Sequence, residues 1–147
     1  EGKHAKELAL EGPSTSRWVP EIIAENNPDD ESYYPYMNGQ FVFKHAVVRF
    51  SEAIIEGLEA NGLQKEDINM LIPHQANLRI AQFIQRKFQL NDDQVYNNIM
   101  NYGNTTAASV IIALTEAWEK GKINEGDLVV LAAFGSGFTW GSVVVRW

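Results

Sequence analysis

The sequence predicts an α/β domain, because segments with the apolar spacing of helices alternate with short apolar runs that suit buried strands. Its 147 residues make about one ordinary domain. A hydrophobic content of 45% supplies a sizeable core, and 21% charged residues is a normal surface. We therefore expect one folded unit, with an irregular segment over residues 1–38 and the core over residues 39–147.

The first helix is predicted over about residues 40–60. Upstream, HAKELAL at residues 4–10 suits a strand or a short helix, and the Pro-, Ser-, Asn- and acid-rich stretch that follows indicates a loop with aromatic anchors. From Phe41 onward, apolar residues recur at steps of three and four, which is the helical period. The pair Asn61-Gly62 then supplies a C-terminal stop.

A buried strand is expected next, over residues 67–72, because this short apolar run ends at Pro73. His74 would lie just past the carboxyl end of that strand. Helical spacing returns over residues 76–88, and a further short strand is predicted over residues 95–101.

The last part of the chain predicts a helix and two strands. In GNTTAASVIIALTEAW, Asn104 or Thr105 would cap a helix whose first turns are apolar nearly all round, so we expect that helix to be buried. Residues 128–134 and 142–147 form apolar runs typical of strands, and a glycine-rich turn joins them.

Composition excludes several classes of function. A formal net charge of −7 opposes nucleic-acid binding, which needs a surplus of Lys and Arg. The absence of cysteine removes disulfides, thiolate metal sites and any cysteine nucleophile within this chain. His4, His45 and His74 show no metal-binding spacing, so no metal site is expected. Neither a membrane helix nor the apolar region of a signal peptide is evident, so we expect a cytoplasmic protein that does not bind membranes.

Two polar residues stand out at expected strand ends. Each has an ordinary explanation, since a histidine after an apolar run is usually a packed residue and an asparagine before a helix is usually a cap. However, His74 and Asn104 both follow predicted strands, and ligands bind at the carboxyl edge of open α/β sheets. Without a carboxylate or a nucleophile the pair cannot form a hydrolytic triad, but its N–H groups can stabilise an oxyanion.

The glycine-rich stretch GSGFTWG at residues 135–141 does not fit a phosphate-binding loop. Its spacing is not GxGxxG, no Lys-Ser/Thr follows, and it leads into a strand, whereas phosphate loops lead into a helix. It is either a hairpin turn that needs positive φ or a place where backbone N–H groups approach a substrate oxygen, and both can hold together.

Three ordered motifs resemble the 3-oxoacyl-acyl-carrier-protein synthase III family, the condensing enzymes that start bacterial fatty-acid synthesis. They are PHQAN at 73–77, GNTTAAS at 103–109 and FGSGFTWGS at 134–142, and the helix entry MNGQFVFKHAV at 37–47 precedes them. The likeness is good over residues 35–147 and weak before them. It implies the C-terminal half of a thiolase-like fold, with helices packed on a mixed sheet and a buried central helix.

The family's catalytic set is a cysteine, a histidine and an asparagine, and His74 and Asn104 match the last two. The cysteine belongs to the first half, at a helix N-terminus that lowers its pKa, and is absent here. Thr106 and Ser136 replace the usual Ser and Gly, which are small changes. The resemblance implies decarboxylative condensation of acyl-CoA with malonyl-acyl carrier protein, no cofactor, and a homodimeric full-length enzyme. It also implies substrate contacts at Gly39, Ala76, Asn77, Phe134, Gly135 and Gly137.

The helix expected over residues 76–88 has a basic face. At 100° per residue, Arg79 and Arg86 lie within about 20° of each other and well away from the apolar face. Solvated surface charge explains such a face equally well. The resemblance, however, implies docking of the acidic acyl carrier protein there, because Arg79 matches a position implicated in that contact.

Three hypotheses describe the whole chain. The first is the C-terminal half of a synthase III, inactive alone, and the start EGKHAKELAL without an initiating Met favours it. The second is a natural cysteine-free subunit or interaction module that pairs with a partner bearing the nucleophile. The third is a non-catalytic globular domain in which His74 is only structural.

Overall fold

A computed structural model of the protein describes residues 1–10 and 34–147. The expected loop with aromatic anchors falls largely on residues 11–33 and so lies outside the described residues. The described chain forms two compact units. The smaller comprises the described parts of Glu1–Phe43 with Gly135–Thr139, and the larger comprises Lys44–Phe134 with Trp140–Trp147.

The smaller unit contains a two-stranded antiparallel sheet. A 3₁₀ helix, η1 (Gly2–Glu7), leads into β1 (Leu8–Ala9), which pairs with β2 (Tyr36–Met37). The prediction of a strand or a short helix over residues 4–10 is thus met by both elements in succession.

Aromatic rings form the core of this smaller unit. The His4 ring lies 5.0 Å from that of Phe41 and 5.7 Å from that of Phe138, between centroids. The N-terminal ammonium of Glu1 donates a hydrogen bond of 2.7 Å to the Phe138 carbonyl. The fully buried Phe138 therefore anchors the start of the chain by its backbone as well as by its ring.

The helix α2 (Gly39–Glu59) confirms the helix predicted over residues 40–60. From Lys44 onward it belongs to the larger unit. Gly62, at φ +66°, follows it in the left-handed conformation that suits glycine after a helix. The buried apolar positions of α2 recur at three- and four-residue steps: Val42, Ala46, Val47, Phe50, Ala53, Ile54 and Leu58.

No helix among the described residues is long and apolar enough to cross a membrane.

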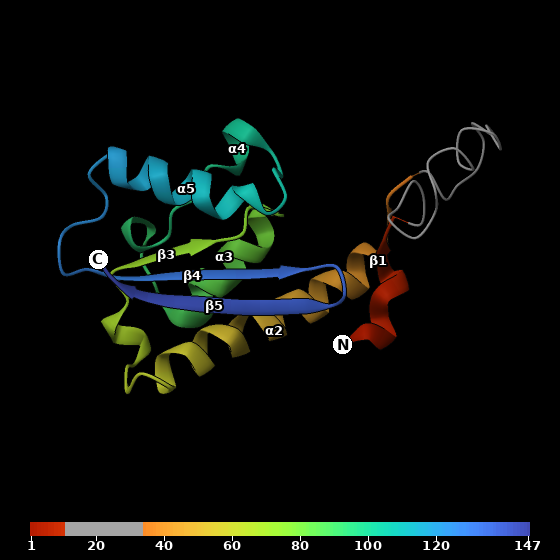
Figure 1. Cartoon of the computed structure of the whole chain (residues 1–147), viewed down its shortest axis with the longest axis horizontal. Helices are drawn as coiled ribbons and strands as arrows, with labels where there is room; N and C mark the ends of the chain where they lie inside the picture. The colour runs from red at the N-terminus through yellow and green to blue at the C-terminus, as the bar shows by residue number, and fades with distance from the viewer. Residues whose placement is uncertain (11–33) are drawn as a thin grey trace, which may run out of the picture. The chain divides into compact units, whose positions relative to one another are not determined.

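A three-stranded mixed sheet forms the centre of the larger unit. Its order is β3 (Met70–Pro73), β4 (Leu128–Gly135) and β5 (Thr139–Arg146). β3 and β4 are parallel, with Met70 opposite Val129, whereas β5 returns antiparallel to β4 in Figure 1. The α/β class is therefore confirmed, and so are the two C-terminal strands, although β5 starts three residues earlier than predicted.

Helices cover both faces of this sheet. The side chains of Met70, Ile72 and Val129 pack with Ala113 and Ala117 of α5 (Ala108–Glu119). Because side chains alternate along a strand, the residues between them face the other way. In Figure 1, α3 (Leu78–Phe88) runs behind the strands, α2 lies below and partly behind them, and α5 lies above them.

Of two short strands predicted in this part of the chain, one is confirmed and one is wrong. The strand expected over residues 67–72 is β3, but it begins only at Met70, because Lys65–Asp67 form a 3₁₀ turn, η3, closed by a capping box. The strand expected over residues 95–101 reduces to a single bridge between Val95 and Leu71. The chain after that bridge forms the short helix α4 (Ile99–Tyr102) instead.

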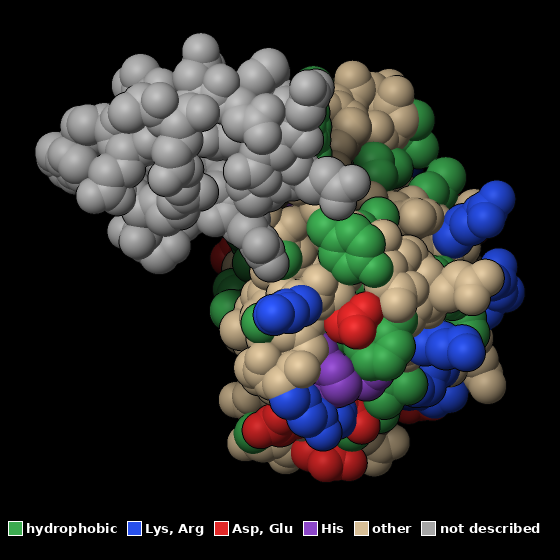
Figure 2. Space-filling view, turned by 90° about the vertical axis from the view of Figure 1, so that its right-hand side faces the viewer, with side chains coloured by type: hydrophobic (Ala, Val, Ile, Leu, Met, Phe, Trp, Pro, Cys, Tyr) green, Lys and Arg blue, Asp and Glu red, His purple; other side chains and the backbone are tan. Residues whose placement is uncertain are grey.

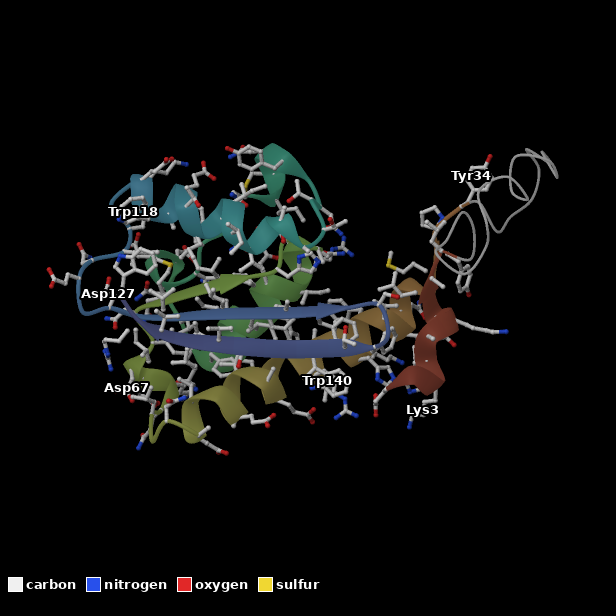
Figure 3. The ribbon with its side chains drawn as sticks, viewed as in Figure 1. Lys3, Tyr34, Asp67, Trp118, Asp127 and Trp140 are labelled. Carbon is white, nitrogen blue, oxygen red and sulfur yellow. The ribbon has the colours of Figure 1, made fainter. Side chains whose placement is uncertain are left out.

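The expected burial of α5 is met on one face of the helix. Ala113 and Ala117 are fully buried against the sheet. On the opposite face, Ile111 is 59% and Trp118 is 56% exposed. Trp118 lies near the C-terminal end of α5 in Figure 3.

Candidate active site

His74 lies at the carboxyl end of β3, as predicted. Its backbone N–H donates to the Ala132 carbonyl at 2.8 Å, which extends the β3–β4 ladder by one bond. Its half-buried ring lies against α5, where Nδ1 is 2.5 Å from Ser109 Oγ. The sheet backbone therefore fixes the main chain of His74, and α5 fixes its ring.

Burial lowers the pKa of His74 below the ordinary value of 6.5. The imidazole is consequently neutral at pH 7. A neutral ring carries one N–H donor and one acceptor nitrogen. His74 is therefore suited to donate a hydrogen bond without bringing a positive charge into the site.

Gln75, the next residue, is a buried hub that sequence reasoning did not assign. Its Nε2 donates to the Pro73 carbonyl at 2.7 Å and to the Tyr96 carbonyl at 3.3 Å. Its Oε1 accepts from the backbone N–H groups of Asn98 and Ile99, both at 3.1 Å. These two N–H groups begin α4 and have no partner inside that short helix. Gln75 thus caps α4, which accounts for a helix where a strand was predicted.

A second set of bonds ties the segment before α4 to α5. Asn98 Nδ2 donates to one carboxylate oxygen of Glu116 at 2.7 Å, and Lys120 Nζ donates to the other at 2.5 Å. The hydrogen bonds from Lys120 and Asn98 hold the pKa of Glu116 below its usual value. The segment that leads to Asn104 is therefore held from both β3 and α5.

Asn104 follows α4 and is exposed. Its Oδ1 accepts from the Thr106 backbone N–H at 2.8 Å, so the side chain closes a local turn. The prediction that Asn104 or Thr105 caps α5 is wrong, because α5 begins at Ala108 without a side-chain cap. Among the described residues no acceptor meets the Asn104 amide nitrogen, which leaves its two N–H groups available.

The turn after Asn104 adopts an unusual backbone. Thr106 has φ +54°, a left-handed conformation that is uncommon for a β-branched residue. Such outliers persist only where the surrounding structure holds them, and they cluster at functional sites. Here the strained residue is the one whose N–H holds the Asn104 side chain.

The segments that carry His74 and Asn104 meet at one edge of the sheet. Ser109, in the first turn of α5, contacts the His74 ring, and Asn104 precedes that turn by only a few residues. In Figure 1 the N-terminal end of α5 lies on the side to which β3 and β4 point. Both candidate donors thus belong to the carboxyl edge of the sheet, although α4, not a strand, precedes Asn104.

The remaining candidate positions lie on several elements of the fold. Ala76 is half-buried after His74, and Asn77 caps α3 by accepting from the Arg79 N–H at 2.9 Å. Phe134 is buried near the end of β4. Gly39, Gly135 and Gly137 belong to the smaller unit.

The glycine-rich stretch is a turn between β4 and β5, as one of the two interpretations predicted. Positive φ is needed at Gly137, at +140°. A Cβ there would lie 2.8 Å from Thr139 Cγ2 and 3.0 Å from its backbone nitrogen, so only glycine fits.

The two faces of α3 agree with the predicted pattern. Ala81, Ile84 and Phe88 are buried, whereas Arg79 and Arg86 are exposed. The face of the molecule drawn in Figure 2 shows Lys and Arg side chains gathered along its right-hand margin.

The chain matches known proteins over most of its length. The family model described as 3-Oxoacyl-[acyl-carrier-protein (ACP)] synthase III C terminal matches residues 58–147. A beta-ketoacyl-[acyl-carrier-protein] synthase III from Caldanaerobacter subterraneus is 54% identical over 112 residues, 76% of this chain and 34% of that protein. Its counterpart from Rhodospirillum centenum is 43% identical over 148 residues, 100% of this chain and 42% of that protein.

Solved structures agree with these matches. The synthase III of Thermus thermophilus is 42% identical, with a TM-score of 0.83, over 100% of this chain and 43% of that one. The enzyme of Pseudomonas aeruginosa is 33% identical, with a TM-score of 0.84, over 100% of this chain and 41% of that one. The expected thiolase-like fold is confirmed, and the chain spans less than half the length of these relatives.

Proposed function

Because the chain belongs to the 3-oxoacyl-acyl-carrier-protein synthase III family, we propose that it is the C-terminal half of a condensing enzyme that joins acyl-CoA to malonyl-acyl carrier protein. The observation that carries this proposal is the pair of unused donors at one sheet edge, the neutral His74 ring and the Asn104 amide. The chain covers about two fifths of the length of its relatives, which supports the view that a preceding half completes the protein.

The proposed reaction divides between the two halves. A cysteine thiolate of the preceding half takes the acyl group from acyl-CoA and releases the CoA thiol. A malonyl thioester then loses CO2, and the bond electrons pass onto its thioester oxygen as an enolate. The enolate carbon attacks the acyl carbonyl, and the cysteine thiolate leaves. This chain has no cysteine, so its part lies in the decarboxylation step.

His74 and Asn104 would donate to the enolate oxygen as charge develops there. One such donor is typically worth roughly 2.7–4 kcal/mol of transition-state stabilisation. Their lack of formal charge suits this role, because a neutral donor does not pay the desolvation cost of a buried ion. No metal or cofactor is needed for this step. Ala76, Asn77 and Gly39 would line the pantetheine path, and Phe134, Gly135 and Gly137 would surround the acyl-enzyme.

The test uses a longer protein that contains this chain and the nucleophile. His74→Ala and Asn104→Ala should each slow CO2 release from the malonyl thioester by about 10²–10³-fold while leaving acylation of the cysteine mostly intact. Gln82→Ala, at an exposed position of α3, is the matched control and should change neither step. Decarboxylation at the parent rate in both donor variants would refute the assignment, and equal loss of both steps would indicate damage to the fold instead.

The basic face of α3 is proposed to receive acyl carrier protein, a strongly acidic partner. Electrostatic steering acts mainly on the encounter rate and fades with salt. Arg79→Glu with Arg86→Glu should therefore raise the apparent KM for malonyl-carrier protein at low ionic strength, with no change for a small malonyl thioester. Lys3→Glu with Lys6→Glu makes the same change in net charge at another exposed site and serves as control. Equal effects of the two double variants would remove α3 from the docking surface.

A natural cysteine-free subunit is the second candidate, favoured by the exposed apolar face of α5. That face suits a partner protein as well as it suits a preceding half of the same chain. The mass of the gene product separates the two. A product near twice this length with a cysteine in its first half supports the condensing enzyme, and a product of this length supports the subunit.

A further inference from the structure

Ser109 stands between the two neighbouring residues His74 and Gln75. Its Oγ lies 2.5 Å from His74 Nδ1 and 3.1 Å from the Gln75 backbone nitrogen. The residue is 2% exposed, so water does not complete its hydrogen bonds. Each bond of this hydroxyl group must therefore be accounted for within the protein.

The direction of the bond to Gln75 is fixed, because a backbone N–H can only donate. A serine hydroxyl has one proton to give and two lone pairs to accept with. The Gln75 N–H occupies one lone pair. Among the described residues, His74 Nδ1 is the one acceptor in contact with the hydroxyl, so the Ser109 proton points to it.

The opposite arrangement leaves a buried donor without a partner. If Nδ1 carried the ring proton and donated it to Ser109, the serine proton would have no acceptor in a site closed to water. An unsatisfied buried donor costs roughly 1–3 kcal/mol. A protonated ring has the same defect, and burial already disfavours its charge.

We propose that Ser109 is a positioning residue that holds His74 in the tautomer with the proton on Nε2. Nε2–H then becomes the ring's free donor, since no described residue accepts it. The assignment of the tautomer stands on the hydrogen bonds alone. Its use in stabilising the malonyl enolate rests on the proposed function.

The side chain that contacts Nδ1 decides whether the histidine ring acts as a hydrogen-bond donor or as a general base. A carboxylate beside Nδ1 accepts a hydrogen bond from Nδ1–H and leaves Nε2 without a proton, which makes the ring a general base, as in hydrolytic triads. A hydroxyl that donates to Nδ1 gives the reverse, a ring that donates through Nε2 and abstracts no proton. Ser109 thus suits His74 to the stabilisation of an oxyanion and not to the activation of a nucleophile.

Nitrogen-15 NMR of the 147-residue chain reads the tautomer directly. Long-range proton–nitrogen correlations of the ring, assigned by their loss in His74→Asn, show which nitrogen carries the proton. At pH 7 we expect a bare Nδ1 and a protonated Nε2, in a single tautomer. A protonated Nδ1 in the parent chain would overturn the proposal without any substitution at Ser109.

Substitutions at Ser109 show whether the hydroxyl is the cause. Ser109→Thr keeps the hydroxyl and should keep the single tautomer, whereas Ser109→Ala should admit a measurable share of the Nδ1–H form. Ser109→Asp should reverse the ring, with the proton on Nδ1. Ser51→Ala removes another fully buried helical serine, whose Oγ donates to the Val47 carbonyl at 2.8 Å, and should leave His74 unchanged. An unchanged tautomer in both Ser109→Ala and Ser109→Asp would refute the role of Ser109.

A kinetic readout in the longer protein links the tautomer to the reaction. Ser109→Ala should slow CO2 release about tenfold, by analogy with the lower end of the loss when the hydrogen-bond partner of a metal-bound histidine is removed, with Ser109→Thr near the parent rate. Cysteine acylation should not change. If the NMR result holds but His74→Ala decarboxylates normally, the tautomer stands and the proposed function fails.

Discussion

His74 and Asn104 lie at the same edge of the sheet but are held in opposite ways. His74 is half-buried, its backbone continues the β3–β4 ladder, and its ring contacts a buried serine. Asn104 is exposed, and its side chain is held by one local bond across a turn that contains the strained Thr106. One candidate donor is thus preorganised by packing within this chain, and the other only by its own turn.

This difference indicates which side of the site has its hydrogen bonds satisfied within this chain and which side is exposed. The buried hub at Gln75 satisfies both atoms of its side-chain amide inside the larger unit. Around Asn104 and along the outer face of α5, by contrast, polar and apolar groups stand exposed. In our account the preceding half covers that side and completes the environment of Asn104, so the two donors should respond differently to changes in this chain.

The largest expected effect is on the His74 side. Gln75→Leu removes four side-chain hydrogen bonds and leaves buried partners such as the Pro73 carbonyl unsatisfied. We expect the free energy of unfolding of this chain to fall by about 3–4 kcal/mol. Urea titration measures it, with Gln82→Leu on the exposed face of α3 as control, expected within about 0.5 kcal/mol of the parent. A loss below about 1 kcal/mol for Gln75→Leu would mean that the four hydrogen bonds of Gln75 do not stabilise the fold as proposed.

The second-largest effect is a difference in the stability cost of one substitution between the 147-residue chain and a longer protein. Ile111 is exposed on α5, so Ile111→Asp should change the unfolding free energy of the 147-residue chain by no more than about 0.5 kcal/mol. Where a preceding half covers α5, the same change buries an unpaired charge and should cost more than about 2 kcal/mol. Equal costs in the two proteins would show that the face of α5 stays open.

A smaller effect follows from the lowered pKa of His74. Since the folded pKa lies below the ordinary 6.5, the unfolded chain binds more protons between these two values. Stability should therefore fall as the pH drops below about 6.5, and level off above it. His74→Gln should flatten this part of the curve of unfolding free energy against pH. Other groups titrate nearby, so the difference between parent and variant is the measured quantity, and two parallel curves would contradict the account.

The smallest effect concerns the turn at Asn104. Thr106→Gly relieves a left-handed β-branched residue, a gain of roughly 1–2 kcal/mol, but adds backbone entropy to the unfolded chain, a loss of roughly 0.5–1 kcal/mol. We therefore expect the unfolding free energy to rise by between zero and about 1.5 kcal/mol. Gln89→Gly, at φ 58° after α3, is the matched control away from the site. Lower decarboxylation by the longer protein with Thr106→Gly, but not with Gln89→Gly, would show that the turn serves Asn104.

Local pattern predicted much of the fold, since the spacing of apolar residues located α2, α3, α5 and the two C-terminal strands. It failed over residues 95–101, because α4 depends on a side chain more than twenty residues earlier, Gln75, which supplies the acceptor for its first N–H groups. Sequence spacing cannot express such a contact. For the same reason Ser109 was not singled out, since its partner His74 is 35 positions away.

The candidate site was predicted in part. His74 followed from its position after a strand, and the family resemblance paired it with Asn104. The cap assigned to Asn104 failed because its oxygen closes a turn with Thr106 before the helix begins. The exposed face of α5 shows a further limit, because an apolar stripe on each side of a helix predicts burial without naming what buries it.

The central claim is that His74 and Asn104 donate to one oxygen, and a double-mutant cycle of CO2 release tests it most directly. In the longer protein, the rates of the parent, His74→Ala, Asn104→Ala and the double variant are compared under single-turnover conditions with cysteine already acylated. Residues that act as a unit are strongly non-additive, so the second substitution should slow decarboxylation far less than the first. If each substitution instead lowers the rate by the same factor whether or not the other is present, the two residues act independently and the shared oxyanion site is contradicted.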